Sequence, residues 1–126
     1  MLLALLLAAG VNCANPPDQA SADGCAGDAD RRADAAMNVQ WKLTLAAEHQ
    51  RDKDYAEVPR GDTRPSYANA LLAAQRDWLK FRDSECTVEA YSVRGGSMEP
   101  QVAAECEARL TQGRTKQLAA IAKGLD

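Results

Sequence analysis

The chain has 126 residues, enough for one domain with one hydrophobic core. Hydrophobic residues make up 46% of it, but alanine supplies 25 of them and aromatic residues only six, which favours helices around a thin core over a β-sandwich. The net charge is −3, and the 15 basic residues form no cluster in the sequence that marks a nucleic-acid or anionic-membrane surface.

The chain begins with an apolar run, Leu2 to Ala9, that ends in small residues up to Gly10. This pattern is typical of the h-region and cleavage zone of a secretory signal, although no Lys or Arg precedes it. The run is shorter than the roughly 20 apolar residues that span a bilayer. We therefore expect a leader over residues 1–12, a periplasmic or secreted domain over 13–126 and no transmembrane span. The alternative is an apolar first turn of a cytosolic helix.

Four cysteines bear on the same question: Cys13, Cys25, Cys86 and Cys106. Their even number and the absence of a C-x-x-C pair favour two structural disulfides over a zinc site or a redox motif. Cys13 also stands where lipoproteins are acylated. However, Gly10 occupies the position three before it, where a Leu-like residue belongs, and acylation would leave three thiols. A lipid anchor at Cys13 is therefore not expected.

The first predicted elements are a coil over residues 14–24 and a helix from about Cys25 to about Asp52. The helix is indicated by apolar side chains at four-residue spacing, namely Met37, Trp41 and Leu45. Residues 53–66 contain two prolines and a glycine, so they predict a connection.

Ser66 is a good N-cap for a second helix, which we expect to reach about Val93 before the glycines of Arg94-Gly95-Gly96-Ser97 end it. A third helix should start at Ser97 or Glu99, with Pro100 in its first turn. Its apolar stripe steps by three and four residues up to Leu125. The prediction is an all-α fold: a small three-helix bundle of antiparallel hairpins with disulfides.

Four cysteines allow three disulfide connectivities. The Gly-Gly turn would bring the end of the second helix, with Cys86, beside the start of the third, with Cys106. This layout favours Cys86–Cys106, closing a loop of about 20 residues, together with Cys13–Cys25.

Catalytic sets are nearly absent from the sequence. His49 is the only histidine, and no Ser or Cys stands in a nucleophile turn beside it. Asp83 and Glu85 point to different helix faces at their i, i+2 spacing. We expect a solvated His49, no metal site, no cofactor and no enzymatic activity.

The densest polar and aromatic stretch runs from Leu72 to Cys86. In it Gln75, Trp78 and Arg82 share a helix face, where a guanidinium can stack on the indole and the carboxamide can bond the backbone of another segment. Either Trp78 is core while Gln75 and Arg82 tie down loops, which is the favoured interpretation, or the three form a partner-facing patch.

This stretch, with Asp83, resembles the signature L-x-x-A-Q-R-x-W-x-x-[FY]-R-D-x-x-C of the LprI-like family of secreted bacterial domains. The resemblance continues through the Gly-Gly turn, Cys106 and Leu110-Thr111-x-x-Arg114-x-x-x-Leu118, and it includes Ala33 to Trp41 in the first helix. It implies a helical, disulfide-containing periplasmic or surface domain. For the inhibitor that names the family, it implies inhibition of lysozyme. The chain departs from the family in its poor lipoprotein motif, and we expect no further domain after Asp126.

Two functions follow as hypotheses. The first is a protein inhibitor of lysozyme, which is a cationic enzyme with an acidic catalytic pair in its cleft. In this hypothesis Arg94, Gly95 and Gly96 of the inhibitor form a loop that enters the cleft. The alternative interpretation of these residues is a plain interhelical turn. The second is a general cell-envelope binding module for peptidoglycan fragments or another envelope protein, with Tyr55 and Tyr67 as exposed aromatics. Neither requires nucleic acid.

Overall fold

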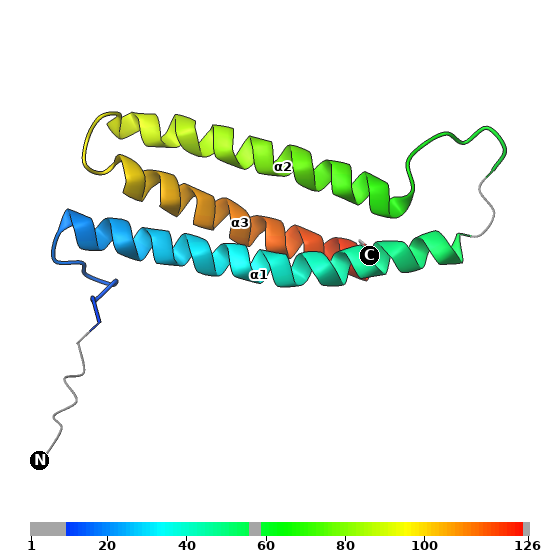
Figure 1. Ribbon diagram of the computed structural model, residues 1–126, viewed down its shortest axis with the longest axis horizontal. Helices are drawn as coiled ribbons and strands as arrows, with labels where there is room; N and C mark the ends of the chain where they lie inside the picture. Colours follow the sequence, from blue (N-terminus) through cyan, green and yellow to red (C-terminus); the bar gives the residue numbers. More distant parts are fainter. Residues whose placement is uncertain (1–9, 56–58, 125–126) are drawn as a thin grey trace, which may run out of the picture.

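A computed structural model describes residues 10–55 and 59–124, and in them three long helices pack side by side (Figure 1). They are α1 (Gln19–Asp54), α2 (Tyr67–Ala90) and α3 (Glu99–Lys123), with a short 3-10 turn, η1 (Tyr91–Val93), after α2. The described residues contain no strand, so the predicted all-α three-helix bundle is confirmed. Most of the predicted leader and the end of the third apolar stripe, Leu125, lie outside the described residues.

The chain runs up, down and up, so that α1 and α3 are parallel and α2 is antiparallel to both. Near the starts of α1 and α3, Gln19 Nε2 donates to Gln101 Oε1 at 2.8 Å. Near their ends, Arg51 Nη2 donates to the carbonyl oxygen of Ile121 at 2.9 Å. Contact between α1 and α3 is the most extensive in the bundle. No helix among the described residues is long and apolar enough to cross a membrane.

The first helix starts six residues earlier than predicted, so residues 19–24 are helical rather than coil. Asp18 is the N-cap, and its carboxylate accepts a hydrogen bond of 2.7 Å from the backbone N–H of Ser21. This bond lowers the pKa of Asp18, because it favours the charged form. The cap satisfies backbone donors that the helix leaves free, so the small residues after it continue the helix.

The second helix is capped as predicted, by the side chain of Ser66, which accepts from Asn69 N–H. The structure adds a second cap from α1, because both carboxylate oxygens of Asp52 accept from backbone N–H groups of α2, Tyr67 at 2.8 Å and Ala68 at 3.1 Å. The α-helix ends at Ala90 rather than Val93, and η1 tightens the last turn.

Both predicted disulfides are present, Cys13–Cys25 and Cys86–Cys106. The first joins the coil before α1 to the first turns of that helix. The second joins α2 to α3 close to the turn between them, and both of its cysteines are buried.

The core is thin. Its large buried apolar side chains are Met37, Leu71 and Leu118, one from each helix. Around them the helices approach through small residues, the buried alanines Ala26, Ala33, Ala68, Ala90 and Ala108. A buried hydroxyl adds a hydrogen bond between α1 and α3, because Thr44 Oγ1 donates to the carbonyl oxygen of Leu118 at 2.8 Å.

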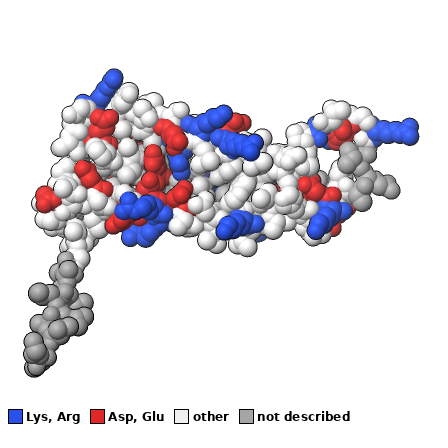
Figure 2. Space-filling view, viewed as in Figure 1, with Lys and Arg blue, Asp and Glu red and all other residues white. Residues whose placement is uncertain are grey.

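Charge is unevenly distributed over the surface. In Figure 2, acidic side chains are frequent over the half of the bundle that carries the turn between α2 and α3, while basic side chains occur along the full length.

Candidate functional site

Gln75 connects all three helices. Its side chain is buried on α2, where Oε1 accepts from Arg114 Nε of α3 at 2.9 Å and Nε2 lies 3.6 Å from Met37 Sδ of α1. The carboxamide therefore bonds side chains of neighbouring helices and not the backbone of another segment, contrary to the prediction.

Trp78 lies between two guanidinium groups. The Cζ atoms of Arg82 and Arg114 are 5.5 Å and 5.9 Å from its ring centre, so the predicted stacking of Arg82 on the indole is present. Burial lowers the pKa of Arg114.

Arg82 reaches both other helices. Its Nη1 lies 3.3 Å from Thr111 Oγ1 of α3 and 3.6 Å from Asp34 Oδ1 of α1, while Nε donates to its neighbour Asp83 at 3.1 Å. Only 15% of the Arg82 side chain is exposed, so this charge is held inside a network rather than presented to solvent.

We call Gln75, Trp78, Arg82 and Arg114 the interhelix clamp. Its polar contacts lie between helices, so they brace the bundle rather than tie down loops. This geometry favours the structural interpretation of the motif over a partner-facing patch. The sequence alone did not predict that Arg114 and Thr111 contact this motif. The clue that could have shown it is the Leu110-Thr111-x-x-Arg114 segment of the family resemblance, because its spacing places both side chains on one face of α3.

The turn between α2 and α3 brings Arg94, Gly95 and Gly96 together at one end of the bundle. Gly95 has a positive φ of 78°, and its N–H donates to Glu99 Oε2 at 2.7 Å. At Gly96 a Cβ atom would lie 3.1 Å from the carbonyl oxygen of Val93, so a side chain there would crowd the turn. The two glycines have different structural roles, one conformational and one steric.

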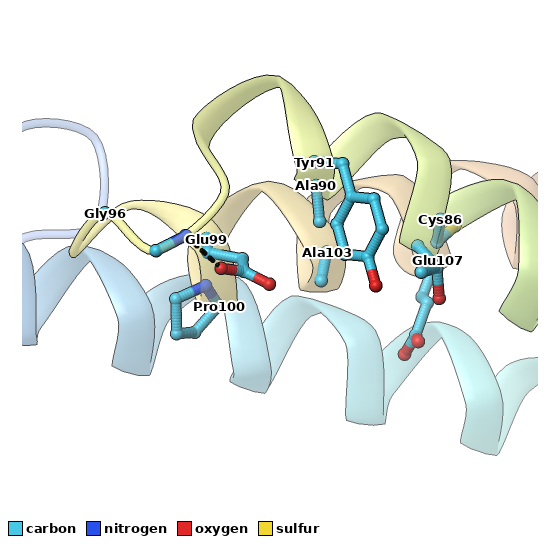
Figure 3. A pocket seen from close by; sticks show the side chains of 10 residues that line it. Cys86, Ala90, Tyr91, Gly96, Glu99, Pro100, Ala103 and Glu107 are labelled. Carbon is cyan, nitrogen blue, oxygen red and sulfur yellow. Dashed lines mark hydrogen bonds between the residues drawn. The ribbon is translucent and has the colours of Figure 1, made fainter.

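Arg94 is exposed, and its guanidinium stacks 4.3 Å from the ring centre of Tyr91. A hollow of about 410 Å³ lies next to this turn between α2 and α3 (Figure 3). Tyr91 and Glu107 border it, and the Cys86–Cys106 disulfide lies beneath the same end of the bundle. The turn is thus exposed, its backbone is held by these contacts, and the Arg94 guanidinium lies at its edge.

Glu107 of α3 shares its surroundings with Asp30 of α1. Burial and the neighbouring Asp30 carboxylate raise the pKa of Glu107, and Asp83 adds to the effect while Arg82 opposes it. Below its ordinary pKa of 4.5, Glu107 is protonated both folded and unfolded. As the pH rises, the unfolded chain ionises first, so the folded state loses stability until the pH exceeds the raised pKa.

We therefore expect Glu107→Gln to raise the Tm modestly at pH 7, because it removes a partly buried negative charge that lies beside the Asp30 carboxylate. The gain should shrink as the pH falls towards 4, which thermal unfolding over a pH series will measure. Glu105→Gln, on the exposed side of α3, is the matched control and should change the Tm little. A Glu107→Gln gain that does not depend on pH would contradict the electrostatic origin.

The opposite end of the bundle carries the two tyrosines singled out from the sequence. Tyr55 and Tyr67 pack edge to face with ring centres 5.9 Å apart, and both are exposed. They line a hollow of about 810 Å³ with Asp62 and Arg64. Hydrogen bonds from Arg64 lower the pKa of Asp62 to about 2. Aromatic faces beside an ion pair can bind a ligand that has both apolar and polar groups.

His49 lies exposed on α1. Within residues 10–55 and 59–124, no group of three or more His, Cys, Asp and Glu side chains is arranged to hold a metal ion.

A sequence model of the family described as Lysozyme inhibitor LprI matches residues 13–118. An uncharacterized protein of Rhizobium meliloti (strain 1021) is 38% identical over 110 residues, which cover 85% of this chain and 76% of the relative. No solved structure matches the chain. The family match spans both disulfides, the interhelix clamp and the turn between α2 and α3.

Proposed function

This chain belongs to the lysozyme inhibitor LprI family, and we propose that it is a periplasmic or secreted protein that binds and inhibits a lysozyme-type muramidase. The family match over residues 13–118 is the observation that carries the proposal. Two disulfides suit a protein that works in an oxidising compartment. A protein inhibitor needs a rigid body and no catalytic group of its own.

The contact is proposed to be made by the turn at Arg94, Gly95 and Gly96. Lysozyme carries an acidic catalytic pair in its cleft, and Arg94 would offer a cation to those carboxylates. Its stacking on Tyr91 and the Glu99 bond to Gly95 reduce the conformational entropy that binding would cost. The acidic side chains on the same half of the bundle would attract a cationic enzyme (Figure 2).

We expect the oxidised protein at micromolar concentration to slow lysis of a bacterial suspension by lysozyme. Arg94→Glu should raise the concentration for half inhibition by about tenfold or more, because one buried charge contact is worth at least 1.4 kcal/mol. Lys116→Glu makes the same charge change on the exposed side of α3 and is the matched control.

The outcomes separate the parts of the proposal. If Arg94→Glu inhibits lysozyme as well as the wild-type protein does, the turn is not the contact, but the inhibitor function stands. If the wild-type protein does not protect the bacterial suspension from lysis, the inhibitor function itself is overturned.

A second candidate function, a general cell-envelope binding module, is favoured by the Tyr55–Tyr67 pair and its hollow. Stacking on sugar rings together with hydrogen bonds to Asp62 and Arg64 would bind a peptidoglycan fragment. Cosedimentation with purified cell-wall sacculi that is lost in Tyr67→Ala, with no effect on lysozyme, would support this module.

A further inference from the structure

The outer side of α1 has a composition unlike the rest of the chain. Between residues 31 and 53, which span about 33 Å of helix, the exposed residues include no acidic one, although the chain as a whole carries a charge of −3. These positions, which we call the outer α1 face, are Arg31, Arg32, Ala35, Ala36, Asn38, Val39, Lys42, Leu43, Ala46, His49, Gln50 and Lys53. Asp34, at the edge of these positions, exposes 48% of its side chain and pairs with Arg82 of α2.

The face has an apolar centre with basic residues around it. Val39 and Leu43 are one turn apart and expose 64% and 60% of their surface, among the highest values for large apolar side chains in the described part of the chain. Arg32 and Lys42 lie on the same side of the helix and make no ion pair with a described residue. In Figure 2 basic side chains are spaced along α1.

The face is bounded by acidic residues at its two ends. Arg31 pairs with Asp28, and Gln50 donates to Asp54 at 2.9 Å. Apart from the adjacent Arg31 and Arg32, the basic residues of the face are ten or more positions apart in the sequence, so no long run of the chain is basic. The helix period brings them onto one side.

We infer that the outer α1 face binds an anionic lipid surface, with the bundle lying parallel to it. Charge complementarity selects an anionic partner, and the apolar centre selects lipid over a nucleic acid, because phosphate contacts would need the basic residues at the centre. Val39 and Leu43 can enter the headgroup boundary while the Arg and Lys stems extend along it and keep their charges at the headgroups. The contact is weak and reversible, since it rests on a few charges and two aliphatic side chains.

This inference is independent of the proposed function. The Arg94 turn belongs to the α2–α3 end of the bundle, and α2 lies on the other side of the bundle from the lower edge of α1 in Figure 1. A lipid-bound molecule would keep the turn free.

The test uses flotation of the full protein with vesicles of phosphatidylcholine, with or without phosphatidylglycerol. We expect binding to the anionic vesicles only, weakened by added salt. Arg32→Glu with Lys42→Glu should reduce partitioning by about tenfold or more, since each basic side chain near an anionic surface contributes about fivefold. Leu43→Ser should also reduce it.

The matched control is Arg76→Glu with Lys80→Glu, the same charge change at exposed positions of α2. Equal losses in the two double variants would mean that only net charge matters and would overturn the assignment to this face. No binding of the wild-type protein, or equal binding to neutral vesicles, would also overturn it. If sedimentation shows that the wild-type protein is a dimer and that the Arg32→Glu, Lys42→Glu variant is a monomer, the proposal is overturned and the face binds a second copy of the chain instead.

Discussion

Replacing both Cys86 and Cys106 by alanine is expected to lower the free energy of unfolding by about 3 kcal/mol. The two cysteines are 20 residues apart, and a crosslink that closes a loop of this length restricts the unfolded chain by about that amount. Alanine is used rather than serine, because a serine would place a hydroxyl group at two positions that are at most 1% exposed. Because small domains have only about 5–15 kcal/mol of stability, the loss should be plain in urea unfolding.

The Cys13→Ala, Cys25→Ala variant is the matched control. Its disulfide closes a shorter loop, of 12 residues, and joins the coil to α1 rather than one helix to another. Cys13 is exposed, so the coil can detach while the three helices stay packed. An equal or larger loss in this control would contradict the view that the Cys86–Cys106 bond is the main covalent brace of the bundle.

The second large effect is expected for Leu118→Ala. Leu118 is 0% exposed and contacts the other large buried apolar side chains, Met37 and Leu71. Replacing a buried leucine by alanine lowers the free energy of unfolding by about 2–5 kcal/mol. The alanine side chains nearby are too short to move into the cavity that is left. The Tm should fall by on the order of 10 °C.

Leu43→Ala is the matched control, the same substitution at a position that is 60% exposed. It should change the stability by less than about 0.5 kcal/mol. Similar losses for the two variants in thermal and urea unfolding would mean that the three-residue cluster is not the centre of the core.

The two ends of the bundle differ in how they are held. At the α2–α3 end, a disulfide, a glycine turn and the Glu99 bond to Gly95 hold the backbone. At the other end, Asp52 caps α2 and Arg51 bonds the carbonyl of Ile121, so polar contacts of α1 hold the helices. The proposed inhibitory turn thus lies at the covalently braced end.

Most of the fold was predictable because its signals are local. Ser66 caps α2 through a residue three positions away, and the Gly-Gly turn brings Cys86 beside Cys106 whatever the rest of the chain does. The start of α1 was missed for a related reason. Asp18 is a good cap, but the prolines and glycine around it are equally typical of coil, and the sequence does not decide between them.

The candidate site was less predictable, because it depends on contacts between distant residues. The stacking of Arg82 on Trp78 follows from their spacing on one helix. The bond from Arg114 to Gln75 joins residues 39 positions apart and depends on how α3 is rotated against α2.

The sequence by itself determined the three helices, both disulfides and the family, since these depend on helix spacing, turn residues and motifs. The apolar spacing indicated one buried side of α1, with Met37, Trp41 and Leu45, but only the tertiary structure decided how the helices are rotated against one another. The small, alanine-rich contacts between helices do not set their rotation in an obvious way. That rotation directs Gln75 and Arg82 inward, brings Glu107 beside Asp30, and leaves the basic residues of α1 on its outer side.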